Sequence, residues 1–183
     1  MSYFEKVSDE CDLKTVSFLY LYKKKMKFMK KQLILLAIIS SLLACQPEGR
    51  VFIEHQDLSP EVEWLKKDKR TFKVPIENLE QAYNFQLTFR YANGYQYRTA
   101  MLKVTETSPS GKESVNEYEL KIRDEKGNYL GDPGYDIIDS EHLVEPNKKY
   151  EEIGTYTYVI EHIMPNDPLN FAMEVGIIVD KIK

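Results

Sequence analysis

Apolar and polar residues alternate with a period of two through most of residues 71–181. A period of two places successive side chains on opposite faces of an extended chain, so it predicts β-strands with one face buried. The clearest example is the segment 83–91. One face of that segment carries Tyr83, Phe85, Leu87, Phe89 and Tyr91, and the other carries Asn84, Gln86, Thr88 and Arg90. We therefore expect a core built from sheets rather than helices.

Two more alternating segments follow, each after a turn sequence. Asn93-Gly94 suits the positive φ angles of a tight hairpin turn and precedes the segment 99–107. Pro109-Ser110-Gly111 is a second turn sequence, and the segment 114–123 comes after it. We therefore expect 83–91 and the two segments after it to pair consecutively as a meander.

The remaining strand candidates have weaker patterns. Residues 155–164 alternate again, and residues 175–182 begin apolar on both faces, which is typical of a central strand. Phe52 and residues 72–76 give two earlier strands, whereas 136–144 fit either a short strand or a turn of helix. Between them, 129–134 is rich in Gly and Pro, which favours an ordered loop.

These patterns together predict an all-β fold. Seven or eight short strands with turn signals and little helix are typical of an antiparallel β-sandwich, immunoglobulin-like or jelly-roll-like. A closed barrel is the alternative architecture. A domain of this size buries about two-thirds of its chain surface, which is enough for a core without disulfides.

The first 44 residues differ in composition from the rest of the chain. All eight Gly and all eight Pro lie beyond position 46. The run 33–45 reads LILLAIISSLLAC and follows a cluster of lysines, which is the pattern of a signal peptide. It is shorter than the roughly 18–20 apolar residues that a membrane-spanning helix requires, so a permanent transmembrane helix is the weaker interpretation.

The end of this run, Leu42-Leu43-Ala44-Cys45, resembles the lipobox of bacterial lipoproteins. The resemblance implies that Cys45 is acylated, becomes the first residue of the mature chain and anchors it to a membrane. Two or three acyl chains suffice, because each buried methylene contributes about 0.8 kcal/mol. The alternative is an ordinary secreted protein with a cysteine near its cleavage site by chance.

Four acidic residues lie in 1–25, where the start of a leader should be basic, so we expect translation to begin at Met26 or Met29. The expected divisions are a mis-assigned extension (1–25), a lipoprotein signal peptide (26–44), an acylated cysteine with a tether (45–50) and one β-sandwich domain (51–183). In Gram-negative lipoproteins an Asp directly after the cysteine would resemble an inner-membrane retention signal. This chain has Gln46 there, and the resemblance therefore implies the outer membrane, on either its periplasmic or its surface face.

The net charge changes from positive to negative at the same boundary, after residue 44. Residues 1–44 hold eight Lys and four acidic residues, whereas the remaining 139 residues hold 17 basic and 25 acidic residues. Because a phosphate backbone is bound by positive surface, a body this acidic argues against nucleic acid as a partner.

The residue types that carry chemistry form no recognisable catalytic set. His55, His142 and His162 lie far apart, without the paired spacing of zinc ligands. No GxSxG turn, phosphate loop or dinucleotide loop occurs in the sequence. His162 shares the apolar face of its segment, which favours a hydrogen-bonded core or edge histidine over a ligand or base. We therefore expect neither an enzymatic activity nor a cofactor.

Two further clusters admit two interpretations each. Asp132, Asp136 and Asp139 surround two glycines and suit either a calcium loop or a plain turn, and the turn is favoured. The cluster of Tyr91, Tyr95 and Tyr97 with Arg98 suits either an exposed contact for a sugar ring or protein partner, or aromatic pairing that stabilises the sheet. Pairing within the sheet is favoured.

Many residues after the lipobox follow one another in a distinctive order and spacing. They are Trp64, Lys66, Asp68, Tyr83, Asn84, Leu87, Arg90, Tyr95, Tyr97, Pro109, Gly111, Leu120, Asp124, Gly127, Leu130, Gly131, Gly134, Asp136, Gly154, Tyr156, Tyr158, Ile160, His162, Met164, Val175, Gly176, Ile177 and Lys181. This pattern resembles the gliding-motility lipoprotein family called GldH. The chain departs from that family's pattern at Tyr129, where a Trp is expected, and at Arg98-Thr99, where an Asn-Leu pair is expected.

The resemblance implies an outer-membrane lipoprotein associated with gliding and secretion machinery, with envelope proteins as partners. It does not imply an enzymatic activity. It implies a family loop at Asp124, Gly127, Gly131, Gly134 and Asp136, which we interpret as loop geometry because glycine supplies backbone angles rather than chemistry. The leading hypothesis is a non-catalytic accessory subunit of an envelope assembly. The alternative is a carbohydrate-binding lipoprotein that uses the tyrosine cluster, and a hydrolase is the least supported.

Overall fold

The alternating segments become β-strands in the computed structural model, which describes residues 49–182. No helix occurs among these residues, and so none that could span a membrane. The strands are β1 (Arg50–Asp57), β2 (Glu63–Trp64), β3 (Arg70–Ile76), β4 (Tyr83–Ala92), β5 (Thr99–Thr107), β6 (Glu113–Lys121), β7 (Asp132–Pro133), β8 (Ile137–Lys148), β9 (Gly154–His162), β10 (Leu169–Asn170) and β11 (Ala172–Lys181).

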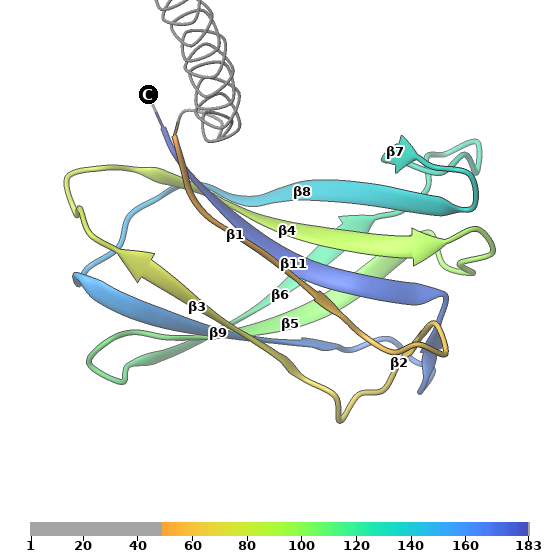
Figure 1. Cartoon of the computed structure of the whole chain (residues 1–183), viewed down its shortest axis with the longest axis horizontal. Coiled ribbons are helices and arrows are strands. Elements are labelled where there is room, and N and C mark those ends of the chain that lie inside the picture. Colours follow the sequence, from red (N-terminus) through yellow and green to blue (C-terminus); the bar gives the residue numbers. More distant parts are fainter. Residues whose placement is uncertain (1–48, 183) are drawn as a thin grey trace, which may run out of the picture. The chain divides into compact units, whose positions relative to one another are not determined.

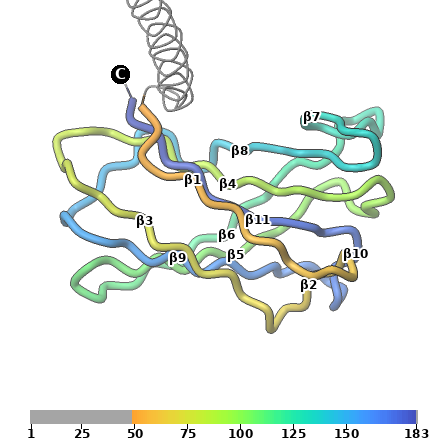
Figure 2. The backbone as a smooth tube through the Cα atoms, in the orientation of Figure 1, coloured from red at the N-terminus to blue at the C-terminus, as the bar shows by residue number. Residues whose placement is uncertain are grey.

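Two antiparallel sheets face each other. The first has the order β1-β11-β4-β8-β7, and the second has the order β3-β9-β5-β6 (Figure 1). A two-stranded sheet of β2 and β10 lies at one end of the sandwich (Figure 2). The predicted antiparallel β-sandwich is therefore confirmed.

The inward faces of the two sheets form the core. In β4 the alternation is nearly complete, and Phe85, Leu87 and Phe89 are buried while Asn84 and Gln86 are not. Aromatic rings from the two sheets meet directly, since the rings of Phe85 and Tyr158 stack with centroids 4.8 Å apart. Burial of such rings from water is the main source of stability for a sheet without disulfides.

The prediction of a central C-terminal strand is confirmed. β11 pairs with β1 on one side and with β4 on the other. All five residues from Val175 to Val179 are buried. Both edges of β11 are occupied and both of its faces are covered, which explains a run that is apolar throughout.

The predicted meander is wrong. Only β5 and β6 pair as expected, whereas β4 lies in the other sheet between β11 and β8. The Asn93-Gly94 turn does form, with a φ of 108° at Gly94. The chain then crosses to the second sheet, because both edges of β4 already pair with strands distant in sequence. Alternation predicts which face of a strand is buried, but not which strand lies beside it.

The structure also decides the open interpretations around residue 136. The segment is a strand rather than helix, and β8 is longer than predicted, with 12 residues. Residues 129–134 form a loop that ends in the two-residue β7. Because β7 pairs only with Ile138 and Asp139, it protects only the beginning of β8.

Candidate functional site

A polar hollow of about 390 Å³ lies on the outer face of the five-stranded sheet. Strand register explains its composition, because residues opposite one another on neighbouring strands share a face. One row runs across the sheet as His55, Gly176, Thr88 and Glu141, and the next runs as Asp57, Glu174, Arg90, Asp139 and Asp132. Four strands and β7 therefore contribute side chains to one surface.

The backbone of Gly176 adjoins His55 and Thr88, two residues that line the hollow, which is called the Gly176 hollow below. A Cβ atom at this position would lie 2.5 Å from the Thr88 hydroxyl oxygen, 2.6 Å from Nδ1 of His55 and 2.6 Å from the backbone oxygen of Glu54. A glycine inside an apolar strand often marks a place where other groups approach the backbone closely. Here it lets the His55 and Thr88 side chains meet above β11.

Hydrogen bonds and ion pairs connect the side chains around the hollow. Nδ1 of His55 lies 3.0 Å from the Thr88 hydroxyl and 3.5 Å from a Glu174 carboxylate oxygen. Arg90 donates to Asp139 from Nε at 2.6 Å and to Glu174 from Nη1 at 3.0 Å. The hydrogen bond to Asp139 raises the pKa of Arg90, so its charge is fixed between two carboxylates.

This geometry suits binding better than nucleophilic catalysis. In a catalytic relay one ring nitrogen of a histidine faces the nucleophile and the other faces an orienting acid. Here Thr88 and Glu174 both lie at Nδ1 of His55, so the acid does not polarise the ring toward the hydroxyl. The Ser140 hydroxyl is not a nucleophile either, because it donates to the Phe89 carbonyl at 2.8 Å.

An apolar row lies directly beside the hollow on the same face. Ile53 pairs with Ile178, Ile178 with Gln86, and Gln86 with Leu143. Ile178 is completely buried, whereas Ile53 and Leu143 remain 47% and 52% exposed. The outer face of this sheet therefore combines an aliphatic surface with an acidic, hydrogen-bonding one.

The tyrosine cluster belongs to the core rather than to a surface. Tyr91 and Tyr95 are 0% exposed, and Tyr97 is half-buried. Burial raises the pKa of Tyr91 to about 12, and its hydroxyl donates to the Leu130 carbonyl at 2.7 Å. This burial agrees with the favoured interpretation, aromatic packing within the fold, because the rings of Tyr91 and Tyr95 packed between the sheets cannot stack on a sugar.

Arg98, at the end of this cluster, is exposed, but its guanidinium is already hydrogen-bonded within the chain. Its guanidinium donates to the backbone oxygen of Asp124 at 2.6 Å. Its own carbonyl accepts from the Ile122 amide at 2.8 Å, which fastens the start of β5 to the end of β6. Arg98 thus holds the family loop against the second sheet.

The family loop is organised by its own hydrogen bonds. The Asp124 carboxylate accepts from the amides of Lys126 and Asn128, and its hydrogen bonds with Asn128 lower its pKa. Gly127 and Gly131 have φ angles of 90° and 125°, which glycine adopts readily. Each of these roles concerns backbone geometry.

The end of the loop is held by backbone contacts. The amide of Gly134 donates to the Ile137 carbonyl at 2.7 Å, and the Asp136 carbonyl accepts from the Asn93 amide at 2.8 Å. Asp139 pairs with Arg90, and no cluster of three or more metal-ligating side chains occurs within residues 49–182. These contacts are those of a plain turn.

The departure at Tyr129 has a structural consequence in this chain. Its hydroxyl accepts from the Gly94 amide at 2.8 Å, and the Arg123 guanidinium lies 3.7 Å from its ring centroid. The indole of a tryptophan has no acceptor to offer Gly94. Tyr129 therefore links the β4–β5 connection to the family loop through a hydrogen bond that a tryptophan could not accept.

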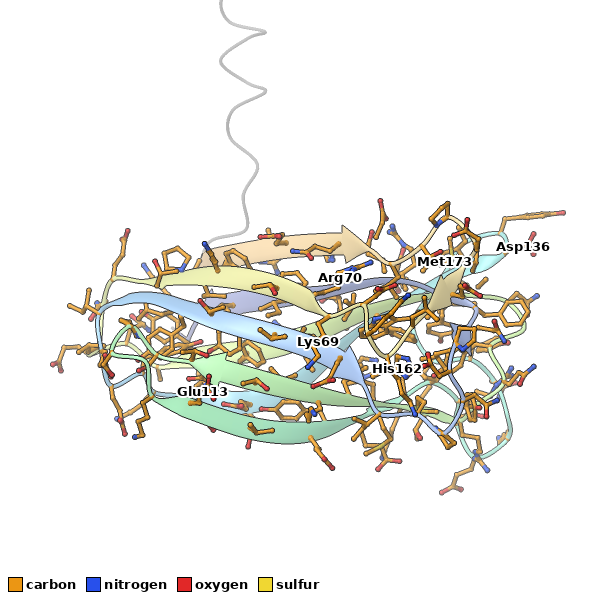
Figure 3. The ribbon with its side chains drawn as sticks, turned by 90° about the horizontal axis from the view of Figure 1, so that it is seen from below. Lys69, Arg70, Glu113, Asp136, His162 and Met173 are labelled. Carbon is orange, nitrogen blue, oxygen red and sulfur yellow. The ribbon has the colours of Figure 1, made fainter. Side chains whose placement is uncertain are left out.

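His162 is buried as predicted, but the predicted hydrogen bond is absent. The residue is 1% exposed and lies at the end of β9, near Lys69 and Arg70 at the start of β3 (Figure 3). Neither ring nitrogen has a hydrogen-bond partner within the described part of the chain. Burial lowers the pKa of His162, although the charge of Asp167 acts in the opposite direction.

Sequence reasoning missed the residues of the hollow. His55, Thr88 and Glu174 are widely separated, and their proximity depends on the pairing of β1 and β4 with β11. The one signal in the sequence was Gly176, a glycine inside a strand that is otherwise apolar. Cys45, the signal peptide and the alternative starts at Met26 or Met29 lie outside the described residues, so their assignments stay predictions.

The fold and this face define a class of protein: an all-β, two-sheet sandwich with a polar hollow on one sheet. The family model described as GldH lipoprotein matches residues 50–179 of the chain. The chain therefore belongs to the GldH lipoprotein family.

Two curated relatives agree with this assignment. A gliding motility lipoprotein GldH from Flavobacterium johnsoniae is 27% identical over 126 residues, which are 69% of this chain and 77% of that protein. A gliding motility lipoprotein GldH homolog from Christiangramia forsetii is 25% identical over 115 residues, which are 63% of this chain and 69% of that protein.

Solved structures are only distantly similar. A 4-O-methyl-alpha-glucuronidase has a TM-score of 0.34 at 15% identity, covering 76% of this chain and 18% of that chain. A TM-score this low supports no conclusion about function.

Proposed function

We propose that the protein is a lipid-anchored, non-catalytic subunit of a motility or secretion assembly in the outer membrane. The observation that carries this proposal is the match to the GldH lipoprotein family over residues 50–179. Relatives that share this family are named gliding motility lipoproteins. In this proposal residues 1–44 are removed, Cys45 carries the acyl chains and the sandwich contacts other envelope proteins.

The Gly176 hollow supports a binding role. Its polar groups are held by neighbours, as Arg90 is by Asp139 and Glu174, so the surface is ordered before a partner arrives. Preorganised side chains lose less entropy on binding. The shared contact of Thr88 and Glu174 with one nitrogen of His55 favours binding over hydrolysis.

The apolar row favours a protein as the partner. Ile53 and Leu143 are exposed aliphatic side chains in the row of the buried Ile178; Ile53 is beside Ile178, and Gln86 separates Ile178 from Leu143. Such a surface, bordered by charged residues, is typical of a protein interface, where an apolar centre has a polar rim. A second envelope protein is therefore the occupant that the mixed character of this face suits best.

Replacement of the anchor tests the membrane part of the proposal. Cys45→Ser should abolish incorporation of labelled palmitate and release the chain from the membrane fraction. In a density gradient the native chain should sediment with outer membranes. Retention of Cys45→Ser in the membrane, or recovery of the native chain with inner membranes, would contradict the proposal.

A photocrosslinking residue at Glu141 tests the binding part. Glu141 borders the hollow and is exposed. In living cells we expect a discrete crosslinked species from position 141 and none from the control position Glu125, which is exposed and does not line the hollow. Equal crosslinking from both positions, or none from position 141, would argue against this face as a contact surface.

A further inference from the structure

The edge of the four-stranded sheet at β6 is unusually open. β6 pairs with β5 through nine consecutive residue pairs without a register shift, and no described strand pairs with its other side. The backbone amides and carbonyls along that side are free to pair with another extended chain. Such an edge is a template for strand addition unless it is protected.

The sheet edges at β3 and β8 are protected in ways that β6 is not. β3 contains Pro75, and the Gln56 side chain from β1 donates to the Thr71 carbonyl on its edge. β8 is paired with β7 at its beginning, has two register shifts against β4 and contains Pro146 near its end. Proline, bulges and covering segments are the usual devices that block edge pairing. β6 contains no proline.

The first half of β6 also lacks cover on either face. All five residues from Glu113 to Glu117 are exposed, so the opposite sheet does not shield the inward positions Ser114 and Asn116. Val115 is 57% exposed. Glu113 marks the start of this strand, at the end of the molecule opposite to Asp136 (Figure 3). An added strand therefore has free space above and below it.

The charge of this edge is negative. Glu113, Glu117 and Glu119 lie on one face of β6, and none has an ion-pair partner within residues 49–182. Lys103 is opposite Glu117, but its ammonium group lies 2.7 Å from a carboxylate oxygen of Glu161 instead. A neighbouring strand with positive side chains at alternate positions would place them beside these glutamates.

The same charges disfavour a second copy of this chain as the occupant. Antiparallel pairing of two β6 strands centred on Val115, Asn116 or Glu117 places at least one glutamate directly opposite another. Like charges in directly opposed positions destabilise a strand pair. The occupant that fits is a different protein.

We propose that β6 is a strand-addition edge that binds an extended segment of another protein with Lys or Arg at alternate positions. Main-chain hydrogen bonds to β6 supply the affinity, and the three glutamates select the basic segment. This surface lies on the other sheet from the Gly176 hollow, and its test does not depend on lipidation or motility.

The test uses the full chain in detergent and a fluorescent nine-residue peptide that alternates Lys and Thr. Fluorescence anisotropy should show saturable binding. The same peptide methylated at every backbone nitrogen keeps its charges but cannot form a ladder, so we expect it to bind at least about tenfold more weakly. Amide hydrogen exchange along β6 should slow when the unmethylated peptide is bound.

Charge-reversal variants complete the test. Glu117→Lys/Glu119→Lys should weaken peptide binding by about tenfold or more, because two favourable neighbours become repulsive. The control Glu77→Lys/Glu80→Lys changes the net charge equally at exposed sites between β3 and β4 and should change binding less than about twofold. No binding, equal binding of the methylated peptide, equal loss in the control, or self-association through β6 would overturn the proposal.

Discussion

Trp64 and His162 lie with their ring centroids 5.2 Å apart and their planes inclined at 59°. The Trp64 indole donates to the Asp68 carbonyl at 2.7 Å, which fixes the turn between β2 and β3. His162 ends β9 beneath that ring without a hydrogen bond from either nitrogen within residues 49–182. Trp64, Asp68 and His162 are among the residues whose spacing resembles the GldH family, and in this structure they lie together at one end of the sandwich.

Substitution of His162 by Met should stabilise the protein at pH 7.5. Methionine has a similar volume, keeps a favourable contact with Trp64 and removes two buried nitrogens that lack partners. A buried unsatisfied polar group costs roughly 1–3 kcal/mol, so we expect the free energy of unfolding in urea to rise by about 1 kcal/mol. His142→Met is the matched control and should destabilise, because Nε2 of His142 contacts the Ser140 hydroxyl at 3.0 Å. Loss of stability in His162→Met would show that the ring makes an essential polar contact.

The same histidines should make stability fall with acidification. Burial lowers the pKa of both His142 and His162 in the folded state. Histidine in the unfolded chain has a pKa of about 6.5, so below that pH the unfolded chain binds more protons than the folded chain. Each of the two histidines therefore lowers the free energy of unfolding by up to about 1.4 kcal/mol for each pH unit of acidification. Urea unfolding at pH 7.5 and 5.5 should show this loss, and His162→Met should reduce it. An unchanged pH dependence in that variant would exclude His162 as a cause.

Two glycines of the family loop should differ sharply in their tolerance of alanine. A Cβ atom at Gly131 would lie 2.3 Å from the backbone oxygen of Asp139, whereas one at Gly127 meets nothing within 4 Å. Both glycines have positive φ angles, so Gly127→Ala should cost about 1 kcal/mol of unfolding free energy. Gly131→Ala adds a backbone clash and should cost about 3 kcal/mol or more. Equal losses in thermal or urea unfolding would contradict this explanation.

Lys148 should be essential to the polar contact between the sheets. Its ammonium group lies 2.7 Å from Glu106 and 2.6 Å from Glu145, and Glu145 also accepts from the Tyr118 hydroxyl. Lys148→Met leaves two poorly solvated carboxylates without a cation and should cost about 2–3 kcal/mol of unfolding free energy. The double variant Lys148→Met/Glu106→Gln should recover part of that loss. A neutral effect of the single variant would show that water replaces the lysine.

Alternation in the sequence predicted most strands because it reports burial directly. The face of β4 with Phe85, Leu87 and Phe89 is buried, and β11 is the central strand that its continuous apolar run predicted. Pairing was not predicted, because alternation contains no information about neighbours. The β4–β5 crossover depends on contacts such as that of Tyr129 with Gly94, which are distant in sequence.

For the same reason, the sequence did not predict most residues of the candidate site. His55 and Thr88 become neighbours only because β1 and β4 both pair with β11 at Gly176. The tyrosine cluster, in contrast, was visible in the sequence, and the favoured interpretation as sheet packing agrees with the burial of Tyr91 and Tyr95. An aromatic pattern alone does not distinguish a core from a binding surface.

The most direct test of the proposed role is native gel electrophoresis of detergent-solubilised outer membranes. We expect the native chain to migrate within an assembly much heavier than the acylated chain alone. The variant Glu141→Arg, still acylated at Cys45, should migrate free of that assembly, and Glu125→Arg should remain within it. Migration of the native chain as a free lipoprotein in these membranes would contradict a role as an assembly subunit.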